Sequence, residues 1–278
     1  MENIPKKLRD GRREDAQDYF FEKDFFTERG QKAFSELFVT KTKIFQSPKS
    51  PGLISKLVEI TLSTDDVFMD FFAGSGTSGQ AVLELNSKDG GKRKFILVQL
   101  PESTGREDYR TISDITKARV GKVITKLNQD SAESNGGNKE DRGFRVFKLA
   151  ESNFKPWAAT VPPDADALTA QLEMHVEHLR IGRTDQDILY EILLKSGFPL
   201  TVSLQTIQIA GKTAYSIPNG ALFICLERHL TLESIRAMAE RRPARVVCLD
   251  EGFAGNDQLK ANAVHIFRGS GVVSFKTV

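Results

Sequence analysis

The chain has 278 residues, of which 40% are hydrophobic and 27% charged, as is typical of soluble globular protein with one large or two modest domains. We expect no membrane partner and no secretory signal, because no apolar run approaches the roughly 18 to 20 residues of a membrane span and the N-terminus is charged. The net charge of +2 does not by itself favour nucleic-acid binding, and two cysteines provide no disulfide framework, so we expect a cytoplasmic protein.

Residues 1–45 are charged and rich in aromatic side chains, and we expect them to form a helical or irregular lead-in. The aromatics are Tyr19, Phe20, Phe21, Phe25, Phe26, Phe34 and Phe38. We interpret them as packing groups rather than base-stacking groups. The apolar spacing of residues 53–61 then predicts a helix, and Pro51 suits its first turn.

An alternation of strands and helices follows. We predict a turn at 64–66, a short buried strand at 67–70, a helix at 77–85 ending near Asn86, a buried strand at 94–100 and a helix at 113–127. Helix, strand, glycine-rich loop, helix and strand in this order are typical of the opening of a parallel α/β sheet.

The second half predicts another α/β segment. Residues 128–141 are polar and predict a loop, 144–149 a strand, and 156–166 a connector. We expect helices at 166–179, 185–195, 231–241 and 256–267, and strands at 200–209, 213–217, 221–226 and 245–250. Thr231 and Asn256 are the expected N-caps of the last two helices.

The loop between the first strand and its helix carries the clearest chemical signal. Gly74, Gly76 and Gly79 form G-x-G-x-x-G directly after a predicted strand and at the start of a helix. Glycines allow a sharp turn and a close approach of backbone to ligand, and a helix N-terminus presents free N–H groups. The pattern therefore predicts a nucleotide site, although a structural turn remains the alternative.

Two polar residues indicate which nucleotide fits. A dinucleotide site favours Asp or Glu at the end of the second strand, where this chain has Gln99. Asp70 lies at the carboxyl end of the first strand, where its carboxylate could meet a cationic amino-acid moiety or could cap the helix. This arrangement suits S-adenosylmethionine, which carries an ammonium and a sulfonium, better than a nicotinamide cofactor.

The sequence DFFAGSGTSG at 70–79 and its continuation AVLELNSKDGGKRKFILVQLPE resemble the cofactor motif and second strand of the Mod subunits of type III restriction-modification systems. The similarity continues through TISDITKARVGKVI, GFRVFKLAESNFKPW and RVVCLDEGFAGNDQLKANAVHIF to the final FKTV, roughly residues 45–278. Lys49 matches the second cofactor motif of that family, whereas Ser50 stands where related enzymes often carry proline.

The resemblance implies a fold and a site. The expected fold is α/β, with a partial Rossmann-like methyltransferase sheet and a smaller C-terminal α/β domain. The implied domains are a lead-in (1–45), an S-adenosylmethionine-binding portion (46–155), a linker (156–166) and a C-terminal domain for subunit contacts (167–278). The implied cofactor-binding residues are Lys49, Asp70, Phe71, Phe72, Ala73, Gly74, Ser75, Gly76, Thr77, Gly79 and Gln99.

Catalytic residues are not predicted in this chain. The family transfers a methyl group to adenine N6 of DNA through an Asp/Asn-Pro-Pro-Tyr/Phe motif, which is absent here because Pro162-Pro163 is flanked by Val161 and Asp164. The target-recognition region is missing as well. The chain alone is therefore expected to be inactive, with DNA, a second Mod copy, the helicase-nuclease restriction subunit and a separate N-terminal half as implied partners. A non-catalytic interaction module that retains the fold is the alternative.

Other candidate groups favour structural interpretations. His175 and His178 lie three residues apart without an evident third ligand, so no metal site is predicted. Cys225 and Cys248 are expected to be buried strand residues.

Overall fold

A computed structural model describes residues 27–39, 42–135, 141–155, 179–253 and 255–278. The chain divides into two compact units, Met1–Phe144 and Arg145–Val278. Within the described ranges, every helix is too short or too polar to cross a membrane. His175, His178, the connector at 156–166 and the aromatics before residue 27 lie outside these ranges.

The first unit has the helix and strand alternation that the sequence predicts. Its elements are α3 (Thr27–Phe38), α4 (Pro51–Thr61), β1 (Val67–Asp70), α5 (Thr77–Asp89), β2 (Lys94–Leu97) and α6 (Ile112–Asn135). β1 and β2 are parallel, in a register that runs from Val67 opposite Lys94 to Asp70 opposite Leu97. Parallel strands need a crossover connection, and α5 provides it.

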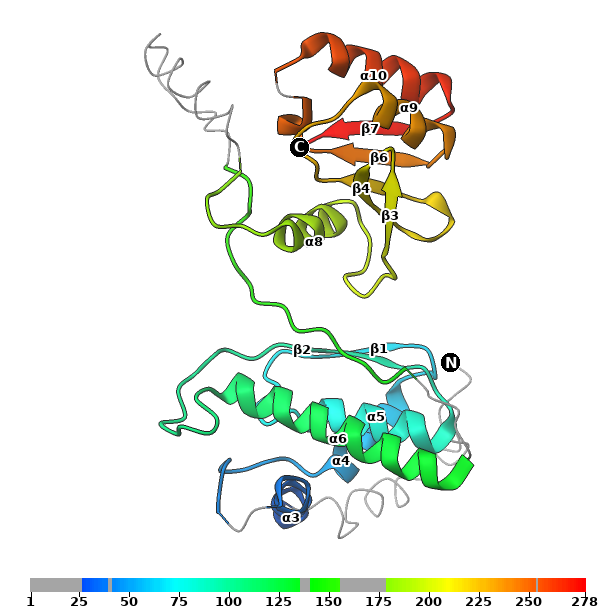
Figure 1. Cartoon of the computed structure of the whole chain (residues 1–278). Coiled ribbons are helices and arrows are strands. Elements are labelled where there is room, and N and C mark those ends of the chain that lie inside the picture. The colour runs from blue at the N-terminus through cyan, green and yellow to red at the C-terminus, as the bar shows by residue number, and fades with distance from the viewer. Residues whose placement is uncertain (1–26, 40–41, 136–140, 156–178, 254) are drawn as a thin grey trace. The chain divides into compact units, whose positions relative to one another are not determined.

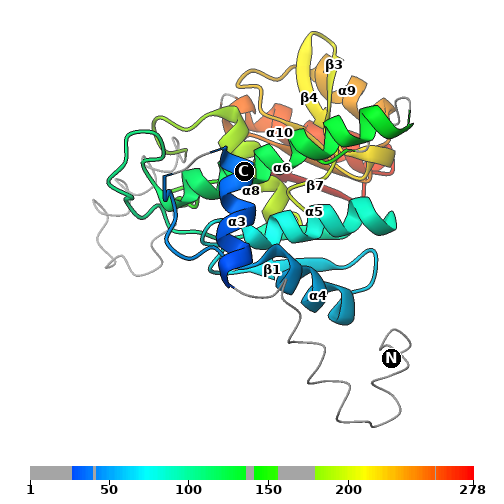
Figure 2. The ribbon, with the colours of Figure 1, turned by 90° about the horizontal axis from the view of Figure 1, so that it is seen from below.

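The helices of this unit cover one face of the β1–β2 pair (Figure 1). Phe68 and Phe95 point to that face and pack against Val58 of α4 and Val82 of α5. Leu97 packs against α6, and α3 lies on α6 through Phe34 and Phe38 (Figure 2). The expectation that the lead-in aromatics pack rather than stack on bases is confirmed for Phe34 and Phe38.

The opposite face of the pair is exposed, so the prediction of fully buried strands is wrong. Val67, Met69, Ile96 and Val98 are between 43% and 51% exposed. Side chains alternate between the two faces of a strand, and the helices described in this unit cover only one of them. The apolar sequence of both strands is typical of strands buried on two faces, and the described residues of this unit cover only one of them.

Several predicted elements change. β2 ends at Leu97, whereas the sequence predicts a strand as far as residue 100. α5 runs one turn past Asn86 and ends at Gly90, whose left-handed backbone (φ 71°) closes the helix. α6 continues to Asn135, so the loop predicted from residue 128 is wrong up to that point. Returning chain stabilises this end, because Arg142 donates to Asn128 Oδ1 and Ser131 Oγ. The strand predicted at 144–149 is not formed, and these residues bind no neighbouring strand.

The second unit is built on a five-stranded sheet. Its elements are α8 (Asp185–Lys195), β3 (Gln205–Ile209), β4 (Lys212–Ser216), the 3-10 turn η2 (Pro218–Gly220), β5 (Phe223–Cys225), α9 (Leu232–Glu240), β6 (Arg245–Cys248), η3 (Asp250–Phe253), α10 (Asp257–Gly269) and β7 (Ser274–Thr277). The order is β3-β4-β5-β6-β7. The first two pairings are antiparallel and the last two parallel.

Two apolar clusters hold this sheet. α9 and α10 pack on one face and α8 on the other (Figure 1). Cys225 and Cys248 are buried free thiols opposite each other on β5 and β6, which confirms the expectation of buried strand cysteines. Thr231 and Asn256 cap α9 and α10 as predicted. β7 is absent from the predicted elements, because the pairing of SFKT with β6 depends on tertiary structure.

Candidate cofactor site

The glycine loop continues the β1–β2 ladder and then turns sharply into α5. The amide of Val98 donates to the Asp70 carbonyl, and the amide of Ala73 donates to the Val98 carbonyl. Gly74 (φ 52°) and Gly76 (φ 80°) then adopt left-handed backbone. Only glycine adopts this region without strain, so these two positions require the residue that the motif supplies.

Gly79 is needed for a different reason, the close packing of α5. A Cβ atom built on Gly79 would lie 3.0 Å from Leu97 Cδ1 of β2 and 3.1 Å from Val120 Cγ2 of α6. A Cβ on Gly76 would lie 3.2 Å from the Thr116 carbonyl oxygen. The loop and the first turn of α5 are thus wedged between β2 and α6.

The N-terminus of α5 is buried, and no side chain caps the backbone N–H groups of its first turn. Gly76 is its N-cap and has no side chain to accept from the first turn. Ser75, Thr77, Ser78 and Gly79 are nevertheless buried. Free N–H groups at such a position, with the positive end of the helix dipole, favour a negatively charged ligand group.

Asp70 and Gln99 fix the loop from the carboxyl ends of the two strands. Asp70 accepts from the Phe72 amide at 3.0 Å and from the Ser78 hydroxyl at 2.5 Å. Gln99 Oε1 accepts from the Gly74 amide at 2.7 Å. Both residues bind protein atoms of the loop, so each helps to fix its shape.

α6 holds the other side of the loop through Thr116 and Arg119. Thr116 Oγ1 donates to the Gly74 carbonyl at 2.6 Å. Arg119 Nη1 donates to both Ser75 Oγ and Thr77 Oγ1 at 2.7 Å, and its Nε donates to Gln80 Oε1 at 2.7 Å. One guanidinium therefore connects Ser75 of the loop with Thr77 and Gln80 in the first turn of α5.

Arg119 is a fully buried cation. Its guanidinium lies 5.4 Å from the Phe34 ring centroid, and burial lowers the pKa of Arg119 to about 10, so it stays protonated at neutral pH. In the described part of the chain, its Nη2 has no hydrogen-bond partner. A buried positive charge beside a helix N-terminus adds to the positive potential of this loop.

Lys49 reaches the loop through its backbone. Its carbonyl accepts from Thr77 Oγ1 at 3.4 Å, and its side chain is exposed. Gly30 of α3 passes close to the same segment, since a Cβ there would lie 2.1 Å from the Pro48 carbonyl oxygen. The second predicted motif is therefore next to the glycine loop, and α3 packs closely behind it.

Phe71 and Phe72, also predicted site residues, lie at the rim. Their side chains are 63% and 91% exposed, whereas Ala73 is buried.

Thr116 and Arg119 are the site residues that the sequence analysis missed. The signal was present: on a helix, Arg119 falls between Ile115 and Val123 on the apolar stripe, where periodicity favours a hydrophobic residue. A charge on the buried face of a helix indicates a specific partner, and here the partner is the loop.

The Gln99 contact gives a local prediction. Gln99→Leu should speed hydrogen exchange of the Gly74 amide about three- to tenfold, because one hydrogen bond contributes about 0.5 to 1.5 kcal/mol. Gln99→Glu keeps the acceptor and should leave the rate near that of the unmodified chain. Exchange of the full chain, followed by NMR, checks this, and equal rates in the two variants would contradict it.

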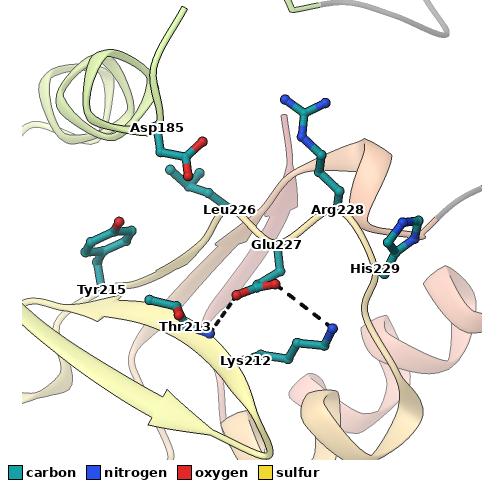
Figure 3. Close-up of a pocket in the computed structure, with 8 residues that line it drawn as sticks. All are labelled: Asp185, Lys212, Thr213, Tyr215, Leu226, Glu227, Arg228 and His229. Carbon is teal, nitrogen blue, oxygen red and sulfur yellow. Dashed lines mark hydrogen bonds and ion pairs between the residues drawn. The ribbon is translucent and has the colours of Figure 1, made fainter.

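The second unit has an open pocket of about 410 Å³ (Figure 3). Asp185, three residues of β4 and the segment after β5 line it, and none of the predicted site residues does. Glu227 accepts from the Thr213 amide at 2.8 Å and pairs with Lys212, and Arg228 pairs with Glu251. These contacts involve three of the charged side chains that line the pocket, Lys212, Glu227 and Arg228. No group of three metal-ligating side chains occurs among the residues described in either unit.

Comparison with known proteins identifies the relatives of this chain. Residues 3–117 match the sequence profile of the DNA methylase family. The chain is 30% identical over 229 residues to the type III restriction-modification enzyme EcoPI Mod subunit of Escherichia phage P1, covering 77% of this chain and 31% of that protein. It is 27% identical over 234 residues to the StyLTI Mod subunit of Salmonella typhimurium, covering 72% and 34%.

A third relative matches a shorter part. The type II methyltransferase M.KpnI of Klebsiella pneumoniae is 36% identical over 105 residues, which cover 36% of this chain and 25% of that protein. The resemblance to Mod subunits is thus confirmed over most of the chain. The chain spans about a third of the length of the Mod subunits that it matches.

Proposed function

From its similarity to type III Mod subunits, we propose that this chain is the S-adenosylmethionine-binding portion of a DNA adenine-N6 methyltransferase. The observation that carries the proposal is the buried, uncapped N-terminus of α5 behind the glycine loop. The loop follows a parallel strand, as in the Rossmann-like folds that bind nucleotides at this edge of a sheet.

The donors of the loop fit the amino-acid end of this cofactor. The free first-turn N–H groups of α5 and the buried positive charge of Arg119 favour its carboxylate. Asp70 at the carboxyl end of β1 favours its ammonium. The neutral amide of Gln99 can bind a ribose hydroxyl, and it stands where a dinucleotide site favours Asp or Glu. Lys49, Phe71, Phe72 and Ala73 would complete the rim, with Gly74, Ser75, Gly76, Thr77 and Gly79 as the cradle.

The contribution of these residues to catalysis is positioning. S-adenosylmethionine supplies a methyl group on a positively charged sulfonium, which leaves as a neutral thioether. The loop is held at four points by Asp70, Gln99, Thr116 and Arg119, so little order would have to be gained on binding. A prearranged donor site lowers the entropy cost of bringing methyl group and acceptor together.

The chain carries no Asp/Asn-Pro-Pro-Tyr/Phe tetrapeptide, so we assign adenine binding to another segment. In this proposal the chain binds the donor in the cytoplasm and that segment presents the flipped adenine of DNA. The unit Arg145–Val278 would serve contacts with a second Mod copy or with the restriction subunit.

A non-catalytic module that retains the fold is the competing function, favoured by the missing tetrapeptide. Calorimetric titration of the full chain with S-adenosylmethionine separates the two. We expect saturable heat that S-adenosylhomocysteine competes away and that NADH does not. A chain that gives no heat and no competition would be the interaction module.

A further inference from the structure

The pocket of the second unit lies at the end of a parallel strand. β5 ends at Cys225, and residues 226–229, which follow it, form part of the lining. β4 is antiparallel to β5, so the start of β4, with Lys212 and Thr213, lies at the same end and lines the pocket too. Crevices outside the carboxyl ends of parallel strands are the common ligand sites of open α/β sheets.

The size and lining of this pocket favour a small charged ligand. Its volume of about 410 Å³ lies in the range of small-molecule sites, about 300 to 1,000 Å³. Of the eight lining residues, only Leu226 is aliphatic, and two acids and two bases carry a full charge. An apolar molecule is therefore unsuited to the pocket, and the balanced charges favour a ligand that carries both signs.

One side of the pocket is negative and aromatic. Figure 3 shows Asp185, the first residue of α8, and Tyr215 on this side. Within the described ranges, the Asp185 carboxylate has no hydrogen bond or ion pair. Burial and the negative charges of Asp185 and Glu227 raise the pKa of Tyr215, so both carboxylates act on its hydroxyl. A carboxylate and an aromatic ring together suit a guanidinium, which pairs with the first and stacks on the second.

The other side carries hydrogen-bond donors, from Arg228 and His229 (Figure 3). Arg228 Nη1 donates to Glu251 at 2.9 Å, and the Arg228 side chain is 63% exposed, so its other donors are open to a ligand. The His229 imidazole forms no hydrogen bond or ion pair with any residue that the structure describes. Guanidinium and imidazole N–H groups are suitable donors to a carboxylate.

Glu227 lies between the two sides and is held in place. Its Oε1 accepts from the Thr213 amide at 2.8 Å, and its Oε2 lies 4.0 Å from Lys212 Nζ. Because this ion pair is long, Oε2 can accept from a further donor such as an ammonium group. The lining thus offers acceptors for two cationic groups and donors for one carboxylate, which is the charge pattern of a basic α-amino acid.

We propose that this pocket binds a free basic α-amino acid of the arginine class. The guanidinium lies at Asp185 and Tyr215, the α-ammonium at Glu227 and the α-carboxylate at Arg228 and His229. The inference does not depend on the methyl-donor function proposed above, because every residue that lines the pocket belongs to the unit Arg145–Val278.

Calorimetric titration of the full chain with L-arginine tests the proposal, with two analogues as comparisons. L-citrulline keeps the α-amino-acid group but has a neutral urea, and N-acetyl-L-arginine amide keeps the guanidinium but lacks the α-charges. We expect saturable binding of L-arginine and at least about tenfold weaker binding of both analogues, because each loses charge-assisted hydrogen bonds.

Two results of the titration would overturn the proposal. One is the absence of saturable heat with L-arginine up to about 10 mM, which fills even a site with a Kd of about 1 mM. The other is equal binding of N-acetyl-L-arginine amide, which would indicate an arginine side chain of a protein partner instead of a free amino acid.

Asp185→Asn and Asp257→Asn test where the ligand lies. Asp257 is the first residue of α10, as Asp185 is of α8, and it lies outside the pocket. Both side chains are exposed, so both variants should stay folded. Asp185→Asn should weaken L-arginine binding about tenfold and Asp257→Asn should leave it unchanged. An equal effect of the two substitutions would show that the Asp185 carboxylate does not bind the guanidinium.

Discussion

Gly76→Val should abolish most cofactor binding by the full chain. Gly76 adopts a left-handed backbone with φ 80°, which costs an L-residue about 1 to 2 kcal/mol. A Cβ at this position also meets the Thr116 carbonyl oxygen at 3.2 Å, and overpacking costs about 1 to 3 kcal/mol more. Since the loop must move away from α6 to relieve this contact, we expect the affinity for S-adenosylmethionine to fall about a hundredfold.

Gly90→Val is the matched control, because it introduces the same left-handed backbone strain without the contact that a side chain at Gly76 makes with Thr116. Gly90 ends the same helix with φ 71°, and a Cβ there meets nothing within 4 Å. Gly90→Val should lower the melting temperature of the chain and leave cofactor affinity near its original value. Calorimetric titration of both variants measures the difference, and an equal loss of affinity in the two would show that contact with Thr116 is irrelevant.

Arg119→Met should loosen the glycine loop while leaving the fold intact. Met fills a similar volume, but it loses the three hydrogen bonds of the guanidinium. Because Met carries no charge, it also avoids the desolvation cost of a buried cation, and this gain offsets part of the lost stability. We expect amide exchange over residues 75–80 to accelerate and cofactor affinity to fall about tenfold, the equivalent of about 1.4 kcal/mol. Global stability should change by less than about 2 kcal/mol.

Arg119→Lys and Lys126→Met are the comparisons for this variant. Lys keeps the charge but lacks the fork that reaches two hydroxyls and Gln80 together, so it should restore only part of the affinity. Lys126→Met makes the same kind of change on an exposed position of α6 and should have no effect. Full binding by Arg119→Met would show that the buried guanidinium does not position the loop.

The charge of Arg119 also sets a pH expectation. Its pKa of about 10 lies below the ordinary value of an arginine, so the protonated form costs stability in the folded chain. This cost is relieved only as pH rises above about 10. Between pH 6 and 9 the difference in the free energy of unfolding between Arg119→Met and the unmodified chain should therefore be constant, and denaturant unfolding at several pH values measures it.

Much of the site could be predicted because its signals are local. The strand 67–70, the glycines at 74, 76 and 79, and the helix that follows are encoded by residues within one short segment. Left-handed turns and helix starts depend on adjacent residues, so the sequence alone indicates them. Gln99 could be placed at the loop as well, because parallel neighbouring strands end at the same edge of a sheet.

The remaining features could not be predicted from local sequence, because they depend on contacts between residues that are far apart in the chain. Thr116 and Arg119 lie 42 and 44 residues beyond the loop atoms that they bind, and no local pattern connects them. β7 forms only through pairing with β6, and α6 extends past its apolar stripe because returning chain binds its end.

The sequence by itself determined that β1 and β2 are apolar on both faces and that a glycine loop follows β1. Only the tertiary structure decided that one of these faces stays uncovered within the described chain and that Asp70 and Gln99 bind the loop itself. The physical reason is that the pattern of apolar side chains along a strand indicates which of its faces become buried. It does not indicate which residues cover those faces, because they lie far away in sequence or outside this chain.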